Sequence, residues 1–341
     1  MRLLAPLVLP LLIAAAPGVA KTDPAKLSDM VKTLAAPDFE GRGPGTAGEE
    51  KTVTWLVERF KALGLEPGGE DGTFIQKVPM VHTRLSGGTM ALGGAAAGQG
   101  KTIALTTVGP NPTIAVNAPL VFVGYGVNAP EAGWDDFKGL DLKGKVPVFL
   151  INDPDFEATA SDGAKGKFGG RRMTYYGRWT YKFDEAAKRG AVAALIIHDT
   201  EGVGYGWSTV NASAGENYDI VRKPGEKIPL QGWIEHEAAK ALFARAGLDL
   251  DRLRVQARQS DFRPGELAGM RFKADLSVAV DRIESRNVIA KLSGAKRPNE
   301  TLMFGAHWDA YGKGPDGTIR AGANDDALGV AGVLELARLF K

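Results

Sequence analysis

The sequence of 341 residues predicts an α/β protein in which a mixed β-sheet lies between helices and carries an inserted α+β domain. Two observations favour this fold class. Residues 271–294 have the pattern of two strands, and residues 301–306 have that of a buried strand followed by a glycine-rich loop and a helix, an order typical of a mixed sheet with helices on its faces. Residues 117–262 have strand and helix patterns of their own, which predict a separate compact unit.

Composition limits the class of protein. Hydrophobic residues make up 44% and charged residues 24% of the chain, which is ordinary for a globular protein, and the length predicts two domains. The net charge is only +2 and no basic stripe is interleaved with aromatics, so nothing favours nucleic-acid binding. The chain has no cysteine, so any bound metal must use nitrogen and oxygen ligands.

Residues 1–20 have the pattern of a secretory signal peptide. Arg2 gives a positive start, Leu3–Ala16 is almost wholly apolar, and Gly18–Ala20 provides small residues before a cleavage point at Lys21. The segment is short for a membrane span, although an uncleaved anchor is the alternative. We expect a secreted or periplasmic protein with no membrane association after cleavage.

Residues 21–116 are predicted to begin with two helices. Asp23-Pro24 pairs a capping carboxylate with a proline suited to the first helical position. Thr46 and Glu49 have the spacing of a capping box for the next helix. Residues 73–116 resemble short strands joined by turns.

In residues 117–262 the hydrophobic pattern changes to one of buried strands that alternate with amphipathic helices. Strands are expected after Pro119, before Asp153, at 191–197 and at 227–234, with helices centred on 181–189 and spanning 235–246.

The candidate chemistry lies in residues 263–341. His307 follows the apolar segment 301–306, at the carboxyl end of a predicted strand, where open α/β sheets bind their ligands. Asp309 is placed to accept a hydrogen bond from the far nitrogen of that imidazole. Asp325 and Asp326 open the last helix, where a carboxylate can cap the helix and still face a cation. This combination can hold a metal pair.

Three parts of the sequence resemble a known family. HWDAYG and AGANDDALGVAGVLELAR look like the first half of the core of the M28 zinc aminopeptidases, and LSDMVKTLAAPDFEGRGPGTAGEEKTVTWLVERFKALGLEP looks like the N-terminal helical segment of that family. FVGYG, GWDDF, DLKGKV and AALIIHD resemble the protease-associated (PA) domain inserted in many members. The resemblance therefore implies a zinc-exopeptidase-like domain made of 21–116 and 263–341, interrupted by a PA-like domain at 117–262.

The resemblance also implies roles for individual residues. His307 would ligate one of two zinc ions, Asp325 would bridge both, and Asp309 would support His307. The peptide bond between Asp325 and Asp326 is often cis in relatives. Relatives take their general base from a Glu-Glu pair after the bridging Asp, and a further Asp and His complete the ligands.

We expect the peptidase domain to be incomplete in this sequence. After Asp326 the only acidic residue is Glu335, in the middle of the predicted helix, and His82, His198 and His236 match no family position. The chain as given is therefore expected to bind zinc weakly and to hydrolyse little.

The function predicted for the intact protein is that of a secreted zinc aminopeptidase that releases N-terminal residues from a peptide substrate. A glutamate-releasing carboxypeptidase is the nearest alternative, because such relatives also carry the PA insert. Glutaminyl cyclases rank lower, since they generally lack that insert. A non-enzymatic binding protein like the transferrin receptor is the alternative from another class.

Overall fold

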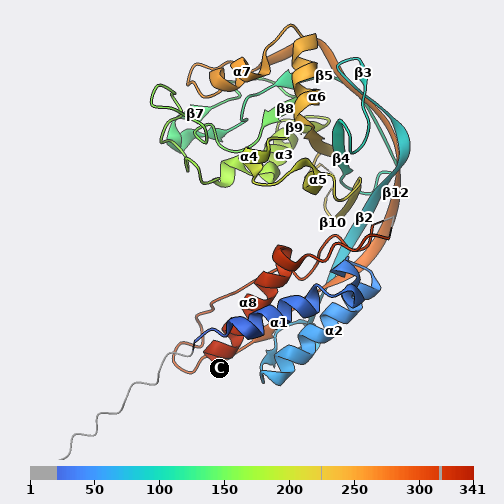
Figure 1. Cartoon of the computed structure of the whole chain (residues 1–341), viewed down its shortest axis with the longest axis vertical. Helices are drawn as coiled ribbons and strands as arrows, with labels where there is room; N and C mark the ends of the chain where they lie inside the picture. The colour runs from blue at the N-terminus through green and yellow to red at the C-terminus, as the bar shows by residue number, and fades with distance from the viewer. Residues whose placement is uncertain (1–20, 224, 315–316) are drawn as a thin grey trace, which may run out of the picture. The chain divides into compact units, whose positions relative to one another are not determined.

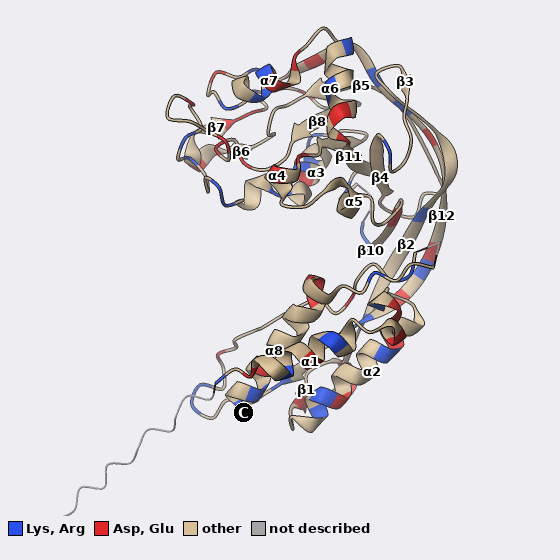
Figure 2. Ribbon diagram, in the orientation of Figure 1, with Lys and Arg blue, Asp and Glu red and all other residues tan. Residues whose placement is uncertain are grey.

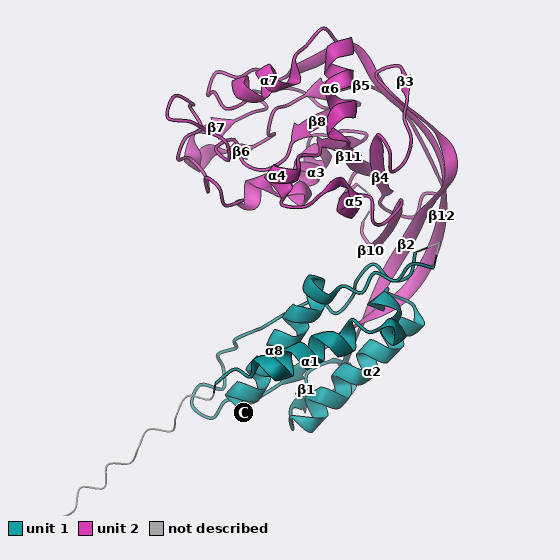
Figure 3. Cartoon of the chain, in the orientation of Figure 1, with its two compact units in different colours: residues 1–76, 288–341 teal, residues 77–287 magenta. Residues whose placement is uncertain are grey.

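The computed structural model describes residues 21–223, 225–314 and 317–341 (Figure 1). The predicted signal peptide, residues 1–20, lies outside them. The chain divides into two compact units, one formed by residues up to 76 together with 288–341 and the other by residues 77–287 (Figure 3). The boundaries proposed at 117 and 262 stay predictions.

As far as its residues are described, the first unit is built on three helices around one apolar core. Its helices are α1 (Pro24–Leu34), α2 (Ala47–Ala62) and α8 (Leu328–Phe340), with a 3-10 turn at Pro37–Arg42 and another at Glu70–Gly72. Two short strands, β1 (Glu66–Pro67) and β13 (Ala290–Lys291), pair antiparallel. The core that these elements share consists of Leu34, Val53, Leu56, Phe60, Phe74, Trp308, Ala327, Val330 and Leu334.

The helix starts follow the sequence signals closely. The Asp23 side chain accepts hydrogen bonds from the N–H groups of Ala25 and Lys26, as its capping position predicts. Thr46 likewise caps α2, by accepting from Gly48. Glu49 is fully buried and accepts from the N–H of Gly45. The carboxylate therefore fixes the turn before α2.

The predicted strand at 301–306 is wrong. These residues form no strand, and Leu302 and Met303 are 81% and 88% exposed. An apolar run becomes a strand only when a neighbouring strand takes up its backbone hydrogen bonds, and in the part of the chain that the structure describes no strand lies beside this segment. The segment approaches His307 as extended, irregular chain.

The second unit contains a mixed sheet of nine strands from the described residues. Their order is β10-β2-β12-β5-β8-β9-β11-β4, with β3 beside β2. Neighbours from β5 through β8 and β9 to β11 are parallel, whereas β4 and β12 join their neighbours β11 and β5 antiparallel. The strands are β2 (Ile75–Leu92), β3 (Ala95–Ala96), β4 (Ile103–Thr107), β5 (Thr113–Phe122), β8 (Val146–Leu150), β9 (Ala194–Ile197), β10 (Glu216–Ile220), β11 (Leu230–Ile234) and β12 (Gly265–Val288).

Helices cover both faces of this sheet. Alternate residues of β5 point into different cores, with Leu120 and Phe122 in one and Val121 in the other. The first core is closed by α6 (His236–Arg245) and α7 (Leu250–Gln256), and the second by α3 (Trp179–Lys188). Smaller elements are α4 (Thr200–Val203), α5 (Trp207–Val210) and a hairpin of β6 (Asn128–Ala129) with β7 (Trp134–Asp135). The expected α/β class with a helix-flanked mixed sheet is confirmed.

Two strands are longer than the sequence predicts. Residues 73–116 were expected to form short strands, but β2 alone runs for 18 residues. The two strands expected in 271–294 correspond to β12, which runs for 24 residues, and to the short β13 at Ala290–Lys291. No Gly or Pro interrupts the alternating pattern between Arg271 and Asn287, so nothing local breaks the strand.

Basic and acidic residues are interspersed on the helices of both units (Figure 2). Among the described residues, no helix has both the length and the apolar character needed to cross a membrane.

Candidate metal site

The structure brings two of the predicted site residues into direct contact. His307 Nε2 lies 3.0 Å from Asp325 Oδ1, although 18 residues separate them in the chain. Asp325 sits in a turn, Ala323–Ala327, that leads directly into α8 and in which Asp325 and Asp326 have non-helical backbone angles. Its peptide bond to Asp326 is cis. Both side chains are more than half exposed, so the pair faces solvent.

Asp309 lies on the other side of the imidazole. Its backbone oxygen is 3.1 Å from His307 Nδ1, and its carboxylate Oδ1 is 3.4 Å from the same nitrogen. A carbonyl can only accept, so Nδ1 carries the hydrogen in this contact. In the neutral ring, that tautomer leaves the lone pair of Nε2 directed at Asp325.

Asp326 links the two halves of the site. Its Oδ2 accepts a hydrogen bond from the backbone N–H of His307 at 3.3 Å, and its Oδ1 accepts from Gly329 at 3.0 Å. The second contact caps the start of α8. Both carboxylate oxygens are thus engaged in holding the backbone.

The acidic surroundings change the titration of the histidine. Partial burial of the ring opposes its charge, but the carboxylate of Asp309, with those of Asp325 and Asp326, outweighs burial and raises the pKa of His307. The imidazole therefore holds its proton to a higher pH than a free histidine does. Metal binding at Nε2 must displace that proton.

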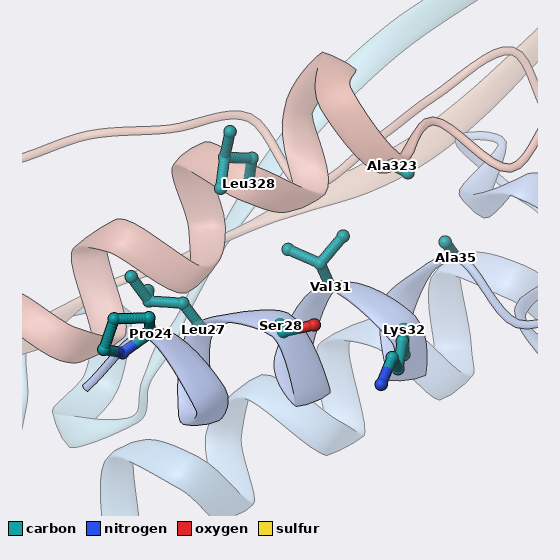
Figure 4. Close-up of a pocket in the computed structure, with 8 residues that line it drawn as sticks. All are labelled: Pro24, Leu27, Ser28, Val31, Lys32, Ala35, Ala323 and Leu328. Atoms are coloured by element: carbon teal, nitrogen blue, oxygen red, sulfur yellow. The ribbon is translucent and has the colours of Figure 1, made fainter.

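An apolar pocket of about 470 Å³ lies between α1 and the segment that carries the acidic pair (Figure 4). Ala323 and Leu328, which flank Asp325 and Asp326 in the sequence, form one of its walls, and α1 forms the other with Leu27, Val31 and Ala35.

Arg42 also belongs to this region. It was not among the site residues predicted from the sequence. Its side chain is fully buried and donates to the carbonyl oxygens of Trp308 and Gly322, beside His307 and just before Asp325. The only sequence signal is an arginine inside the glycine-rich loop before α2, and nothing in that loop indicates contact with residues near 308 and 322.

The other candidate side chains are engaged elsewhere. Glu335 is buried, pairs with Arg338, and accepts from the N–H of Asp23. His82 Nε2 lies 2.9 Å from Glu216 Oε1, and His198 Nε2 lies 3.1 Å from a backbone oxygen, both within the second unit. Their printed contacts thus involve neither His307 nor Asp325.

The pair fits zinc in donor type but not in number. Imidazole nitrogen and carboxylate oxygen are usual zinc ligands, and two ligands about 2.05 Å from one tetrahedral zinc are about 3.3 Å apart, close to the 3.0 Å seen here. Catalytic zinc sites use three protein ligands. Within residues 21–223, 225–314 and 317–341, no three His, Asp or Glu side chains form a group that could hold a metal ion.

The segment that carries the candidate site matches a known protein family. Peptidase family M28 matches residues 287–341, which include His307, Asp309 and Asp325. Residues 287–341 are therefore similar to this peptidase family. The match starts at the end of β12 and runs through α8, so the resemblance to M28 peptidases noted from the GANDDALG segment is confirmed there.

Solved structures give distant matches to this chain. An aminopeptidase from Aneurinibacillus sp. strain AM-1 is 23% identical with a TM-score of 0.44, over 94% of this chain and 59% of its own. BSAP, a zinc aminopeptidase from Bacillus subtilis, is 20% identical with a TM-score of 0.42, over 94% of this chain and 58% of its own. A peptidase M28 precursor from Shewanella amazonensis SB2B is 18% identical with a TM-score of 0.45, over 92% of this chain and 60% of its own.

The chain thus spans about three fifths of the length of these structures, and likeness this distant does not assign an activity. No curated protein matches the chain.

Proposed function

We propose that this chain carries part of the catalytic site of an exported, zinc-dependent M28 exopeptidase that removes N-terminal residues from peptides. The contact between His307 Nε2 and Asp325 Oδ1 is the main support, because it directs a nitrogen and an oxygen donor at one point. The family match over 287–341 supports the reaction class. In this proposal His307 would hold one zinc ion, Asp325 would serve as a ligand shared with a second, and Asp309 would orient His307.

When bound, zinc would act as a Lewis acid towards the peptide carbonyl. The protein residues contribute orientation. Asp309 accepts the Nδ1–H of His307 through its backbone oxygen, which keeps Nε2 available for the metal. Asp326 holds the backbone of His307 and so fixes the distance between the two ligands.

We also propose that hydrolysis by this chain is slow. The general base expected from the family resemblance is a carboxylate free to take a proton from water. Asp326 is engaged through both oxygens, Asp309 faces the imidazole, and Glu335 is paired with Arg338. None of these three carboxylates is available for that role.

Zinc binding is the direct test of the site. Calorimetric titration of the metal-free protein with Zn²⁺ should show binding that is lost in His307→Ala and Asp325→Ala. His236→Ala removes a histidine of the second unit and should bind zinc like the unsubstituted protein. Equal binding by all four proteins would contradict the assignment of His307 and Asp325.

Hydrolysis of aminoacyl p-nitroanilides tests the reaction class. Turnover should be slow, abolished by EDTA, restored by Zn²⁺, and absent with N-acetylated substrates. Release of C-terminal glutamate from N-blocked peptides would favour the carboxypeptidase alternative. Fast turnover would contradict the proposed lack of a base, and turnover unaffected by EDTA would contradict a zinc enzyme.

Export is tested separately. Expressed in a bacterium, the protein should be recovered from the periplasm or the medium with Lys21 as its N-terminal residue. Deletion of residues 2–20 should leave it in the cytoplasm. Retention of the unprocessed chain in the membrane fraction would contradict cleavage.

A further inference from the structure

Arg42 lies within the first unit, at the end of the turn Pro37–Arg42 that follows α1. The guanidinium is fully buried, and the residue has a φ of 54°, a left-handed conformation that non-glycine residues seldom adopt. Such a backbone persists when surrounding contacts hold it in place. The contacts of the side chain supply that constraint.

Arg42 donates hydrogen bonds to four backbone carbonyl groups. Nε donates to Trp308 at 2.7 Å, and Nη1 to Leu34 at 2.6 Å. Nη1 also donates to Ala321 at 2.7 Å, and Nη2 donates to Gly322 at 2.8 Å. A planar guanidinium presents its donors in a fixed fork, so these bonds fix three chain segments relative to one another.

The accepting carbonyl groups lie on both sides of the candidate metal site. Trp308 stands between His307 and Asp309, while Gly322 precedes Asp325 by three residues. One buried side chain therefore holds the backbone of the histidine loop against the backbone that leads to the acidic pair.

The backbone next to Arg42 reinforces this arrangement. The carbonyl oxygen of Arg42 accepts from Ala310 N at 3.2 Å, and that of Gly41 accepts from Gly312 N at 2.9 Å. At Gly41 an added Cβ would lie 2.5 Å from the oxygen of Gly312, so no side chain fits between these two chain segments. The loop before α2 thus packs directly against the loop after His307.

The charge of Arg42 also acts on the site. Burial opposes the charged form and lowers the pKa of Arg42, while Asp309, Asp325 and Asp326 act in the opposite direction through their charges. Its hydrogen bonds go to neutral carbonyl groups, so the positive charge is balanced by the carboxylates of the site at longer range. A neutral donor would hold the carbonyl groups without that balance.

We propose that Arg42 is a positioning residue that sets the spacing between His307 and Asp325 and so enables this pair to bind zinc. The inference rests on the proposed zinc site and adds to it a residue that contacts no metal. Residues that support a ligand in this way typically change metal affinity by about 10–100-fold when they are replaced.

The test uses Arg42→Ala and Arg42→Lys. Lys keeps the positive charge and three donors but lacks the planar fork, so this variant should fold and show a smaller effect. Arg245→Ala is the matched control, because Arg245 also donates to two carbonyl groups, those of Leu92 and Gly93, in the second unit. Zinc affinity should fall about 10–100-fold in Arg42→Ala, less in Arg42→Lys, and not in the control.

NMR of the ¹⁵N-histidine-labelled protein separates positioning from general stability. The chain has four histidines, so four imidazole signals are expected, and His307→Gln assigns the one of interest. In metal-free Arg42→Lys and Arg42→Ala, only the His307 signal should shift. Addition of ethylguanidinium to Arg42→Ala should restore that signal and part of the zinc affinity.

Folded variants that keep both the His307 signal and the zinc affinity within twofold would overturn the inference, even if they melt at lower temperature. A shift of all four histidine signals together would also overturn it. Failure of the unsubstituted protein to bind zinc would contradict the proposed function instead, and the metal-free His307 signal would then still decide whether Arg42 positions that ring.

Discussion

Asp326 holds the backbone of His307, with its Oδ2 3.3 Å from the histidine nitrogen. The other oxygen of the same carboxylate caps α8 through Gly329. The residue next to one predicted ligand therefore fixes the other, and the start of the helix is coupled to the histidine loop.

Replacement of Asp326 by Ala should destabilise the protein and weaken zinc binding. Two N–H groups lose their acceptor, which costs about 1–3 kcal/mol in the free energy of unfolding. Urea denaturation measures this cost. Asp29→Ala is the control, because Asp29 is 77% exposed and only pairs loosely with Lys32, so a change below about 1 kcal/mol is expected. Equal effects of the two substitutions would contradict the structural role of Asp326.

Two glycines of α8 should respond oppositely to alanine. At Gly329 an added Cβ would lie 2.3 Å from Asp326 Oδ1, whereas at Gly332 it would meet nothing within 4 Å. Gly332→Ala should therefore gain up to about 1 kcal/mol from helix propensity. Gly329→Ala should lose stability, because the Asp326 carboxylate is displaced from its cap. Thermal unfolding of the two variants checks the sign, and a stabilising Gly329→Ala would show that Asp326 does not need its present position.

Glu335 should contribute stability that disappears in acid. The hydrogen bond from Arg338, helped by the N–H of Asp23, lowers the pKa of Glu335 to about 2. An unfolded glutamate titrates near about 4.3, so the contribution is complete above that pH and is lost as the pH falls towards 2. Unfolding of Glu335→Gln and of the unsubstituted protein in urea, from pH 7 to pH 3.5, should give a difference that is constant at the upper end and shrinks below about 4.3.

The control for this measurement is Glu58→Gln, an exposed position on α2 whose substitution should change stability by less than about 0.5 kcal/mol. A difference between Glu335→Gln and the unsubstituted protein that grew in acid would contradict the lowered pKa of Glu335.

Lys182 should be essential to the second unit. Its ammonium group is fully buried and donates to the carbonyl groups of Tyr125, Asn152 and Tyr176. Lys182→Met should cost about 3–5 kcal/mol, since three acceptors lose their donor and nearby Asp153 and Asp136 lose their counter-charge. Lys188→Met, on the same helix but 64% exposed, should cost less than about 1 kcal/mol. Similar unfolding midpoints for the two variants would contradict this assignment.

Features set by neighbouring residues were predictable from the sequence. The caps at Asp23 and Thr46 depend on contacts within three residues, and both formed. The buried strands and the flanking helices of the second unit also follow their hydrophobic periods, as β8 and β9 show. The meeting of His307 and Asp325 was indicated by the family pattern, which already contains the long-range information.

Features set by distant residues were not predictable. Residues 301–306 have the composition of a buried strand, but composition does not say whether another strand lies alongside. Arg42 gives no local sign that its partners lie near residues 308 and 322. The contact between the Asp326 carboxylate and the backbone N–H of His307 likewise joins residues 19 positions apart, which no local pattern indicates.

The bond between Arg42 and Trp308 closes a loop of 266 residues, which bears on the order of folding. Closing so long a loop is entropically costly while the intervening chain is unstructured, and much less so once residues 77–287 are compact. We expect the second unit to gain protection first and the zinc ligands to be aligned last, which pulse-labelling hydrogen exchange would reveal as late protection of the amides near Ala310. Earlier protection of the amides near Ala310 than of those in β8 would contradict this order of folding.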